Sequence, residues 1–146
     1  MTTQTNQKGF TIIELLIVIV IIGILATITA VVLGGATERA RDAQRESDAS
    51  NIRRALETSY TLGNNVYPTL ADANSADFRD QFGIDDEMYQ DPSGTSTDLT
   101  DDATAVNQYI YQPTDCDEVG LGGCLGYTLT VNLEGDDDAI VRTNQQ

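Results

Sequence analysis

One uninterrupted apolar segment near the amino end limits what this chain can fold into. From Phe10 to Leu33 the sequence reads FTIIELLIVIVIIGILATITAVVL, and Glu14 is its only charged residue. About 20 apolar residues in a helix suffice to cross the hydrocarbon layer of a membrane. The many β-branched residues would also suit a strand, but strands are shorter, and a lone strand in lipid leaves backbone polar groups unpaired. We therefore expect residues 10–33 to form a membrane-spanning helix.

The charges on either side of this segment are unequal and predict its orientation. Lys8 is the only charged residue before the segment, so the short amino end is expected to stay in the cytoplasm. The chain has 23 acidic and 8 basic residues, a net charge of -15, and residues 63–146 contain 17 acidic residues beside only Arg79 and Arg142. The acidic remainder is expected outside the cytoplasm. Its acidity also fits a well-solvated or halophilic surface.

Composition argues against several classes of function. Nucleic acid binding depends on clustered Lys and Arg, which this chain lacks, so no direct nucleic acid partner is expected. The absence of His excludes every mechanism that needs an imidazole base or ligand. Neighbouring acids such as Asp85 and Asp86 occur without any inferable substrate-positioning group. We therefore expect a protein that is not an enzyme. No cofactor is expected either, with calcium as the one ion considered below.

The residues around the start of the apolar segment form a distinctive motif, K-G-F-T-I-I-E-L-L. An ordinary secretory signal is cleaved after its apolar stretch. Here the polar residues 1–9 end in Gly9, directly before the apolar run. This arrangement resembles the class III signal of type IV prepilins and of the related pseudopilins of type II secretion. The resemblance implies that a membrane prepilin peptidase cuts between Gly9 and Phe10 and that Phe10 becomes N-methylated.

Glu14 stands out on physical grounds as well. An ionisable group inside a membrane helix costs roughly 2.5 to 3.5 kcal/mol unless it is paired. The resemblance implies that Glu14 pairs with the free amino terminus of a neighbouring subunit and so sets the axial step of a growing filament. A buried ion pair of this kind is better evidence for register than for stability. The alternative is that Glu14 reaches the membrane surface from the start of the helix.

The helix is expected to continue to Leu62, because residues 36–60 contain no Pro and are rich in Ala, Arg and Glu. At ~1.5 Å per residue it would be about 80 Å long, more than so small a domain can cover. Like helices from other copies would have to cover it, which predicts a homopolymer. Gly63, Asn64 and Asn65 are expected to stop the helix. One apolar stripe recurs at three- and four-residue spacing, with charges on the opposite face: Ala49, Ile52, Leu56 and Tyr60.

Residues 63–146 are expected to form an acidic globular head. Its first residues, GNNVYPT at 63–69, resemble a loop that follows the long helix in major pseudopilins and pilins of that subgroup. Residues 70–105 predict a surface loop with one or two short helical turns, and alternation at 106–112, 127–133 and 139–141 predicts three antiparallel strands packed on the stripe. The predicted fold class is therefore α+β, the pilin fold, with residues 63–105 as loop region and 106–146 as sheet.

Cys116 and Cys124 are the only cysteines, and both fall in the part expected outside the cytoplasm. An oxidising environment there favours a disulfide between them. A redox or thiolate-metal role is the alternative, although seven intervening residues match neither common spacing.

Two runs of carboxylates suggest a possible calcium ligand set, Asp115–Glu118 and Glu134–Asp138. Related pseudopilins bind calcium near their carboxyl ends. Neither run has EF-hand spacing, and both also read as solvated acidic turns, the second as a hairpin turn.

Together these features predict the major pilin of a type IV pilus, used for adhesion, motility or DNA uptake. The first alternative is the major pseudopilin of a type II secretion system, and an alternative of another class is a membrane-anchored calcium-binding surface domain. The expected partners are other copies of the chain, the prepilin peptidase, an assembly platform and minor pilins. The precursor is expected in the cytoplasmic membrane as a single-pass protein, and the product in an extracellular pilus or a periplasmic pseudopilus.

Overall fold

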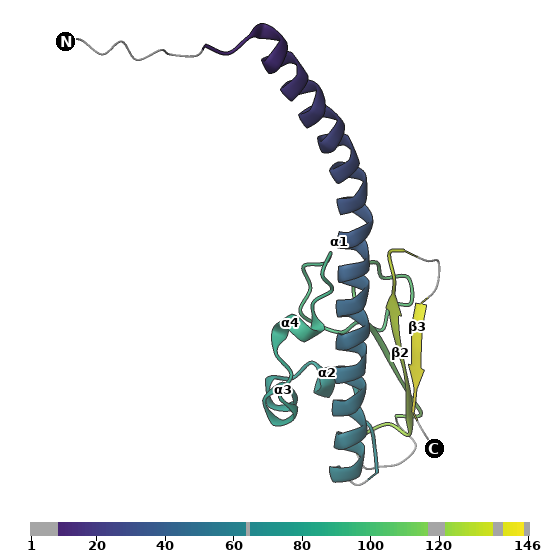
Figure 1. The fold of residues 1–146 in the computed structure, drawn as a ribbon. Coiled ribbons are helices and arrows are strands. Elements are labelled where there is room, and N and C mark those ends of the chain that lie inside the picture. The colour runs from purple at the N-terminus through teal and green to yellow at the C-terminus, as the bar shows by residue number, and fades with distance from the viewer. Residues whose placement is uncertain (1–8, 64, 117–121, 136–138, 145–146) are drawn as a thin grey trace, which may run out of the picture. The chain divides into compact units, whose positions relative to one another are not determined.

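The computed structural model describes residues 9–63, 65–116, 122–135 and 139–144. The chain forms two compact units that divide between Thr37 and Glu38. Helix α1, Ile12–Leu62, contributes its first part to the amino-terminal unit and its last part to the second unit, the head (Figure 1). The predicted continuous helix is confirmed, and it begins two residues after Phe10.

In the described part of the amino-terminal unit, the residues from Ile12 onward form a helix with a long apolar segment. The window Ile12–Thr29 is long and apolar enough to cross a membrane, as the sequence predicts for residues 10–33. Thr27 and Thr29 leave no unpaired hydroxyl donor on this apolar surface, because each hydroxyl donates a hydrogen bond to a backbone carbonyl of α1.

The end of α1 follows from its last residues. The backbone N–H of Gly63 donates to the Ser59 carbonyl at 2.7 Å, and that of Asn65 donates to the Tyr60 carbonyl at 3.1 Å. Asn65 adopts a φ of 62°, the left-handed conformation that asparagine tolerates better than most residues. The predicted stop after Leu62 is confirmed, while Asn64 lies outside the described residues.

The head is built around the last part of α1. The predicted stripe is confirmed: Ala49, Ile52 and Leu56 are fully buried, and Tyr60 packs against the same core. The prediction that charges occupy only the opposite face is wrong. Arg45 and Asp48 are 1% and 7% exposed, because acidic and hydroxyl partners from distant segments lie opposite them.

The sheet described on one side of α1 has the order β1-β2-β3 and is antiparallel throughout. Its strands are β1, Ile110–Thr114, β2, Gly126–Asn132, and β3, Ala139–Thr143. Leu129 and Val131 of β2 are fully buried and join Ile52 and Leu56 in one core. The α+β architecture and the three-stranded antiparallel sheet are confirmed.

The first strand lies further along the chain than the predicted residues 106–112. Val106 is 76% exposed, and Asn107 has a φ of 55°, which takes the backbone out of the extended region. Tyr109 and Tyr111 are buried and lie on either side of Ile110, the first residue of β1. The alternation that suggested a strand at 106–112 therefore reflects the packing of these two side chains in the core.

Three short helices lie between α1 and the sheet in sequence, where one or two turns were predicted. They are α2, Leu70–Ala73, α3, Ala76–Phe82, and α4, Asp86–Tyr89. Thr69 and Ser75 cap the first two by accepting backbone hydrogen bonds. Within the head, α3 and α4 lie on the side of α1 opposite β2 and β3, whereas α2 contacts β1 (Figure 1).

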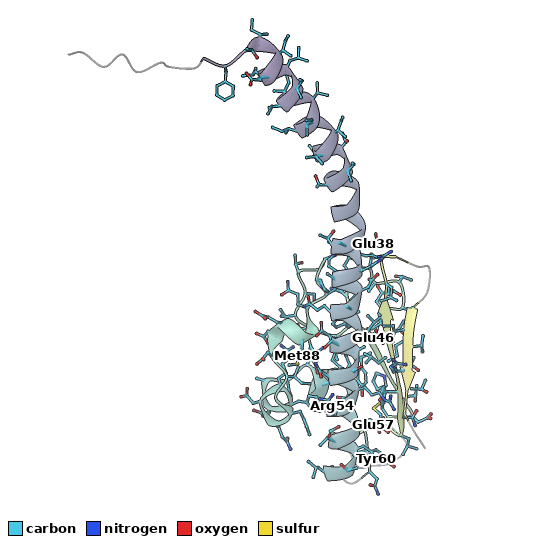
Figure 2. All side chains as sticks on the ribbon, in the orientation of Figure 1. Glu38, Glu46, Arg54, Glu57, Tyr60 and Met88 are labelled. Carbon is cyan, nitrogen blue, oxygen red and sulfur yellow. A yellow bond between two sulfur atoms is a disulfide. The ribbon has the colours of Figure 1, made fainter. Side chains whose placement is uncertain are left out.

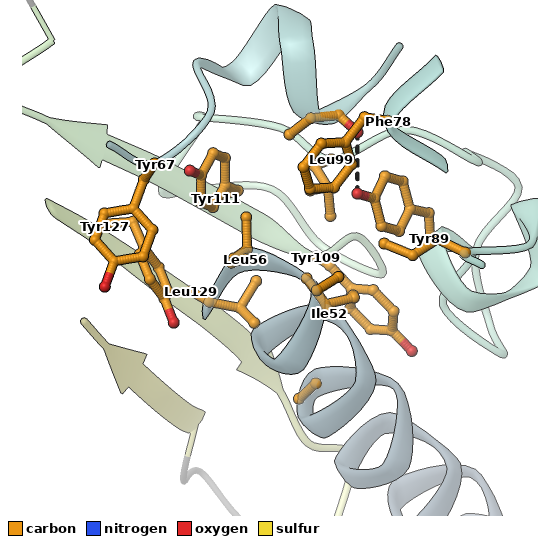
Figure 3. Packing of buried hydrophobic residues seen from close by; sticks show 14 of the residues in the cluster. Ile52, Leu56, Tyr67, Phe78, Tyr89, Leu99, Tyr109, Tyr111, Tyr127 and Leu129 are labelled. Atoms are coloured by element: carbon orange, nitrogen blue, oxygen red, sulfur yellow. Dashed lines mark hydrogen bonds between the residues drawn. The ribbon is translucent and has the colours of Figure 1, made fainter. Parts of the chain in front are cut away.

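Tyrosines dominate the core of the head, and their hydroxyls are hydrogen-bonded (Figure 3). Tyr67 and Tyr127 donate to the two carboxylate oxygens of Glu57 at 3.0 and 2.9 Å. Tyr89 donates to the Ala73 carbonyl at 3.0 Å, and Tyr109 to Asp48 at 2.9 Å. Each buried ring therefore contributes apolar packing without leaving its hydroxyl unsatisfied.

The predicted disulfide between Cys116 and Cys124 is present. Cys124 also exchanges two backbone hydrogen bonds of 2.8 Å with Tyr67. The disulfide therefore closes a loop beside the junction between the segment after α1 and the strand β2.

Replacing both Cys116 and Cys124 by Ser is expected to lower the free energy of unfolding by about 2–3 kcal/mol, because the bond restricts the unfolded chain. Urea unfolding of the full chain in detergent measures this. Tyrosine fluorescence is a suitable probe, because the chain has no Trp and its tyrosines fill the core. A reductant should lower the stability of the natural chain and leave the double variant unchanged. Equal urea midpoints for both proteins would contradict the prediction.

Candidate functional site

The predicted cleavage point lies in non-helical backbone ahead of α1. Gly9 and Phe10 are both exposed, Phe10 by 89%. The space around the Gly9 α-carbon is open, and a methyl group added there would meet no described atom within 4 Å. The peptide bond between Gly9 and Phe10 is therefore accessible, whereas the rest of the predicted leader lies outside the described residues.

Thr11 and Glu14 form a reciprocal cap at the start of α1. The Glu14 backbone N–H donates to the Thr11 hydroxyl oxygen at 3.3 Å. In return, the Glu14 carboxylate accepts hydrogen bonds from the Thr11 backbone N–H at 3.0 Å and from its hydroxyl at 2.9 Å. This is the capping box, in which two otherwise unpaired donors of the first helical turn are satisfied.

The capping box gives Glu14 a second function beside the predicted one. Its carboxylate is stabilised by two hydrogen bonds from its own chain and by the partial positive charge at the helix start. These interactions offset part of the cost of placing the acid next to lipid. Thr11 was not singled out from the sequence, although Thr-x-x-Glu before an apolar run is the signal that would have identified it.

The apolar surface of α1 over Ile12–Thr29 surrounds the helix. Figure 2 shows side chains extending to both sides of this part of α1. Every large hydrophobic side chain described there is more than half exposed: Ile12, Ile13, Leu15, Leu16, Ile17, Val18, Ile19, Val20, Ile21, Ile22, Ile24, Leu25 and Ile28. A helix that is apolar on all faces requires a covering of lipid or of other apolar helices.

A second cluster, on the head, joins three segments through Arg45. Its guanidinium donates to both carboxylate oxygens of Asp91 at 2.7 and 2.8 Å, to Asp42 at 2.8 Å and to Glu134 at 2.7 Å. Arg41 also pairs with Glu134. Asp42 in turn accepts the backbone N–H groups of Glu134 and Gly135 at 3.0 and 3.2 Å. The cluster fastens the segment after α4 and the end of β2 to α1.

The cluster lowers the pKa values of Glu134 and Asp42. Hydrogen bonds from Arg41, Ser93 and Arg45 hold the pKa of Glu134 well below its ordinary 4.5. The Glu134 backbone N–H lowers the pKa of Asp42 below 3.8. Burial acts in the opposite direction on Asp48 and raises its pKa.

The stability of the head should therefore fall on acidification. An acid with a lowered folded pKa stabilises the fold above its unfolded pKa and loses that contribution as the pH falls through the folded pKa. The contributions of Glu134 and Asp42 should be complete above about pH 5 and decline below it. The contribution of Asp48 to folding stability has the opposite sign. Because its pKa is raised in the folded state, its ionisation as the pH rises disfavours the fold. Unfolding midpoints measured between pH 3 and pH 7 test this, and Glu134→Gln should flatten the acid limb while Asp101→Asn, at an exposed site, should not.

Of the carboxylates considered as calcium ligands, the structure describes Asp115 and Glu134, and it does not bring them together at a metal site. Glu134 is held by Arg41 and Arg45, and Asp115 is exposed. Residues 117, 118 and 136–138 lie outside the described residues. In the described ranges no group of three or more His, Cys, Asp or Glu residues is placed to hold a metal ion.

Comparison with known proteins finds one family motif and several relatives that match part of this chain. The prokaryotic N-terminal methylation motif matches residues 4–30. The type II secretion system core protein G of Aeromonas hydrophila is 44% identical over 66 residues, which are 45% of this chain and 46% of that protein. The protein of the same name from Escherichia coli K12 is 41% identical over 69 residues, 47% of each chain.

A fimbrial protein of Pseudomonas aeruginosa is 34% identical over 90 residues, 62% of this chain and 56% of that protein. The chain thus spans about half the length of the curated relatives it matches. No solved structure matches it.

Proposed function

Because the chain belongs to the type IV pilin and pseudopilin family, we propose that it is a structural filament subunit, the major pilin of a type IV pilus, and not an enzyme. The observation that carries the proposal is the exposed apolar surface of α1 over Ile12–Thr29, in which Glu14 is the one charged residue. A polymer of the same helix covers such a surface, and each copy supplies both the surface and its cover.

The proposed maturation begins with prepilin peptidase. The enzyme would cut the exposed bond between Gly9 and Phe10 and methylate the new amino group of Phe10. Before this step Lys8 would hold the amino end in the cytoplasm and Ile12–Thr29 would cross the membrane once.

In the proposed assembly step, the amino group of Phe10 of an incoming subunit approaches Glu14 of a subunit already in the filament. The carboxylate exchanges part of its bonding to Thr11 for a charge-assisted hydrogen bond to that amino group. Because the pair forms in apolar surroundings, a subunit one helical step out of place leaves both charges unpaired. An assembly platform and minor pilins are the proposed further partners.

A pseudopilus is the second candidate, and the comparisons give each candidate its own support. The core protein G relatives have the higher identities, up to 44%. The fimbrial relative extends over more of this chain, 62% against 45%. Electron microscopy of filaments sheared from the cell surface distinguishes the two: long fibres that contain this protein support the pilus, and filaments confined to the periplasm support the pseudopilus.

Mass spectrometry of the mature protein tests the maturation directly. The amino terminus is expected to be N-methylated Phe10, with residues 1–9 removed. Gly9→Val should accumulate the uncut precursor in the membrane, because the bulkier residue replaces the cleavable glycine. An unmodified terminus at Met1 in assembled protein would contradict the proposal.

A further inference from the structure

We propose that the head carries two grooves of opposite charge and that the basic groove of one subunit binds the acidic groove of a second copy of this chain. This inference rests on the proposed filament function and adds the surface by which neighbouring heads recognise each other.

The basic groove, called the arginine groove below, lies between α1 and β3. Its lining contains Arg53 and Arg54 from α1 and Arg142 from β3, beside Ser50 and Glu57. Figure 2 shows Arg54 and Glu57 on the same part of α1. In the part of the chain that the structure describes, no carboxylate forms an ion pair with any of these three arginines.

Glu57 can offset only one of the three positive charges that line the arginine groove. Its two carboxylate oxygens accept the hydroxyls of Tyr67 and Tyr127 at 3.0 and 2.9 Å. Three arginines therefore line a groove with one carboxylate, which already has two hydrogen-bond donors. By contrast, Arg45 and Arg79 each pair with at least two acids, and Arg41 pairs with Glu134, which it shares with Arg45. In a chain of net charge -15, three arginines gathered beside a single carboxylate, with no ion pair among the described residues, indicate an anionic partner outside the chain.

The acidic groove lies on α3 and α4. Four aspartates line it around Arg79, namely Asp80, Asp85, Asp86 and Asp98. Arg79 pairs with Asp86 at 2.6 Å and with Asp98. Asp80 and Asp85 form no ion pair with any described residue and remain available to an external cation.

The two grooves face different neighbours. Within the head, α3 and α4 lie on one side of α1 and β3 lies on the other (Figure 1). One subunit can therefore offer its arginine groove to one copy and its acidic groove to another. Such head-to-tail contacts are heterologous, and heterologous contacts produce open helical filaments instead of closed pairs. Complementary charge also favours correct encounters and disfavours wrong ones.

A free polyanion is the less suitable occupant. It would have to approach a chain of net charge -15 from solution against repulsion. A second copy brings its acidic groove within reach at high local concentration once α1 has entered the filament.

Charge reversal in the full chain, expressed in cells, tests the proposal. The double variant Arg54→Glu with Arg142→Glu and the double variant Asp80→Arg with Asp85→Arg should each reduce sheared filaments by about tenfold, because like charges then face each other. Combining all four substitutions should restore most of the yield. Arg39→Glu and Asp101→Arg are exposed-site controls with the same types of charge change and should have little effect. Formation of the Cys116–Cys124 disulfide reports that each variant head has folded.

Several results would overturn the proposal. One is a filament yield that neither double reversal changes, measured in cells where the natural chain polymerises and the Glu14→Ala variant does not. That result would overturn the groove contact but leave the proposed function standing. Another is a combined variant no better than the double variants. A third is a reversed arginine groove that weakens binding of filaments to double-stranded DNA but keeps their yield, which would assign the groove to a polyanion. Absence of filaments from the natural chain would instead remove the proposed function itself.

Discussion

Glu14→Ala is expected to abolish incorporation of the protein into filaments. The substitution removes the carboxylate that the proposed mechanism pairs with the amino terminus of a neighbour. It leaves the apolar surface of Ile12–Thr29 and the bond between Gly9 and Phe10 intact. Membrane insertion and leader removal should therefore continue, and the mature protein should accumulate in the membrane. Immunoblots of sheared filaments and of membranes, together with the mass of the mature chain, measure the three steps separately.

Thr11→Ala separates the two roles of Glu14. It removes the hydroxyl that caps α1 and binds the Glu14 carboxylate, but it retains the acid itself. Loss of such a cap costs about 0.5–2 kcal/mol of helix stability, which should reduce filament yield only in part. If Thr11→Ala were as severe as Glu14→Ala, the capping of α1 would explain both effects. Normal filament yield from Glu14→Ala would show that the proposed pairing is wrong.

Arg45→Met is expected to destabilise the head by about 3–5 kcal/mol, the usual cost of removing one partner from a buried ion pair. Arg45 is 1% exposed and donates twice to Asp91, which is 2% exposed. The methionine would retain the bulk of the side chain and leave the Asp91 charge buried without its guanidinium. Urea unfolding of the full chain in detergent, followed by tyrosine fluorescence, gives the difference.

Arg54→Met is the matched control, because Arg54 lies on the same helix but is exposed and has no ion pair with a described residue. Its effect on unfolding should stay within about 0.5 kcal/mol. Combining Arg45→Met with Asp91→Ala should cost less than the sum of the two single changes, since the second removes the stranded charge. Additive losses would mean that Arg45 and Asp91 do not act as a pair.

Local sequence predicted the parts of the fold that local physics determines. The apolar run from Phe10, the stripe of Ile52 and Leu56, and the stop after Leu62 each depend on neighbouring residues, and the structure confirms them. The strand predicted at 127–133 lies at Gly126–Asn132, because its alternation matches the buried residues of β2.

The parts that were predicted wrongly depend on contacts between distant residues. Arg45 looked like a surface charge, since its partners Asp91 and Glu134 are 46 and 89 positions away. The strand β1 continues through Pro113, which sequence patterns disfavour, because β1 is an edge strand of the described sheet. Three short helices were predicted as one or two because four-residue helices such as α2 leave little periodicity to detect.

For the candidate site, the sequence indicated Glu14 but not its partner on the same chain. The cost of an acid in an apolar helix drew attention to Glu14, while Thr11 looks like any other polar residue until the first turn of α1 is in place. Gly9 and Phe10 were identified by their position before the apolar run, and whether they are processed as predicted depends on an enzyme outside the chain.

The bonds between Thr11 and Glu14 also bear on how easily a filament could come apart. A carboxylate stripped of every donor on leaving its neighbour would enter lipid as a bare ion, so detachment would be very costly and assembly nearly irreversible. Here the same acid can return to donors on its own backbone and side chain. Detachment then exchanges one hydrogen-bonded arrangement of the carboxylate for another, so a modest mechanical pull suffices to remove a subunit.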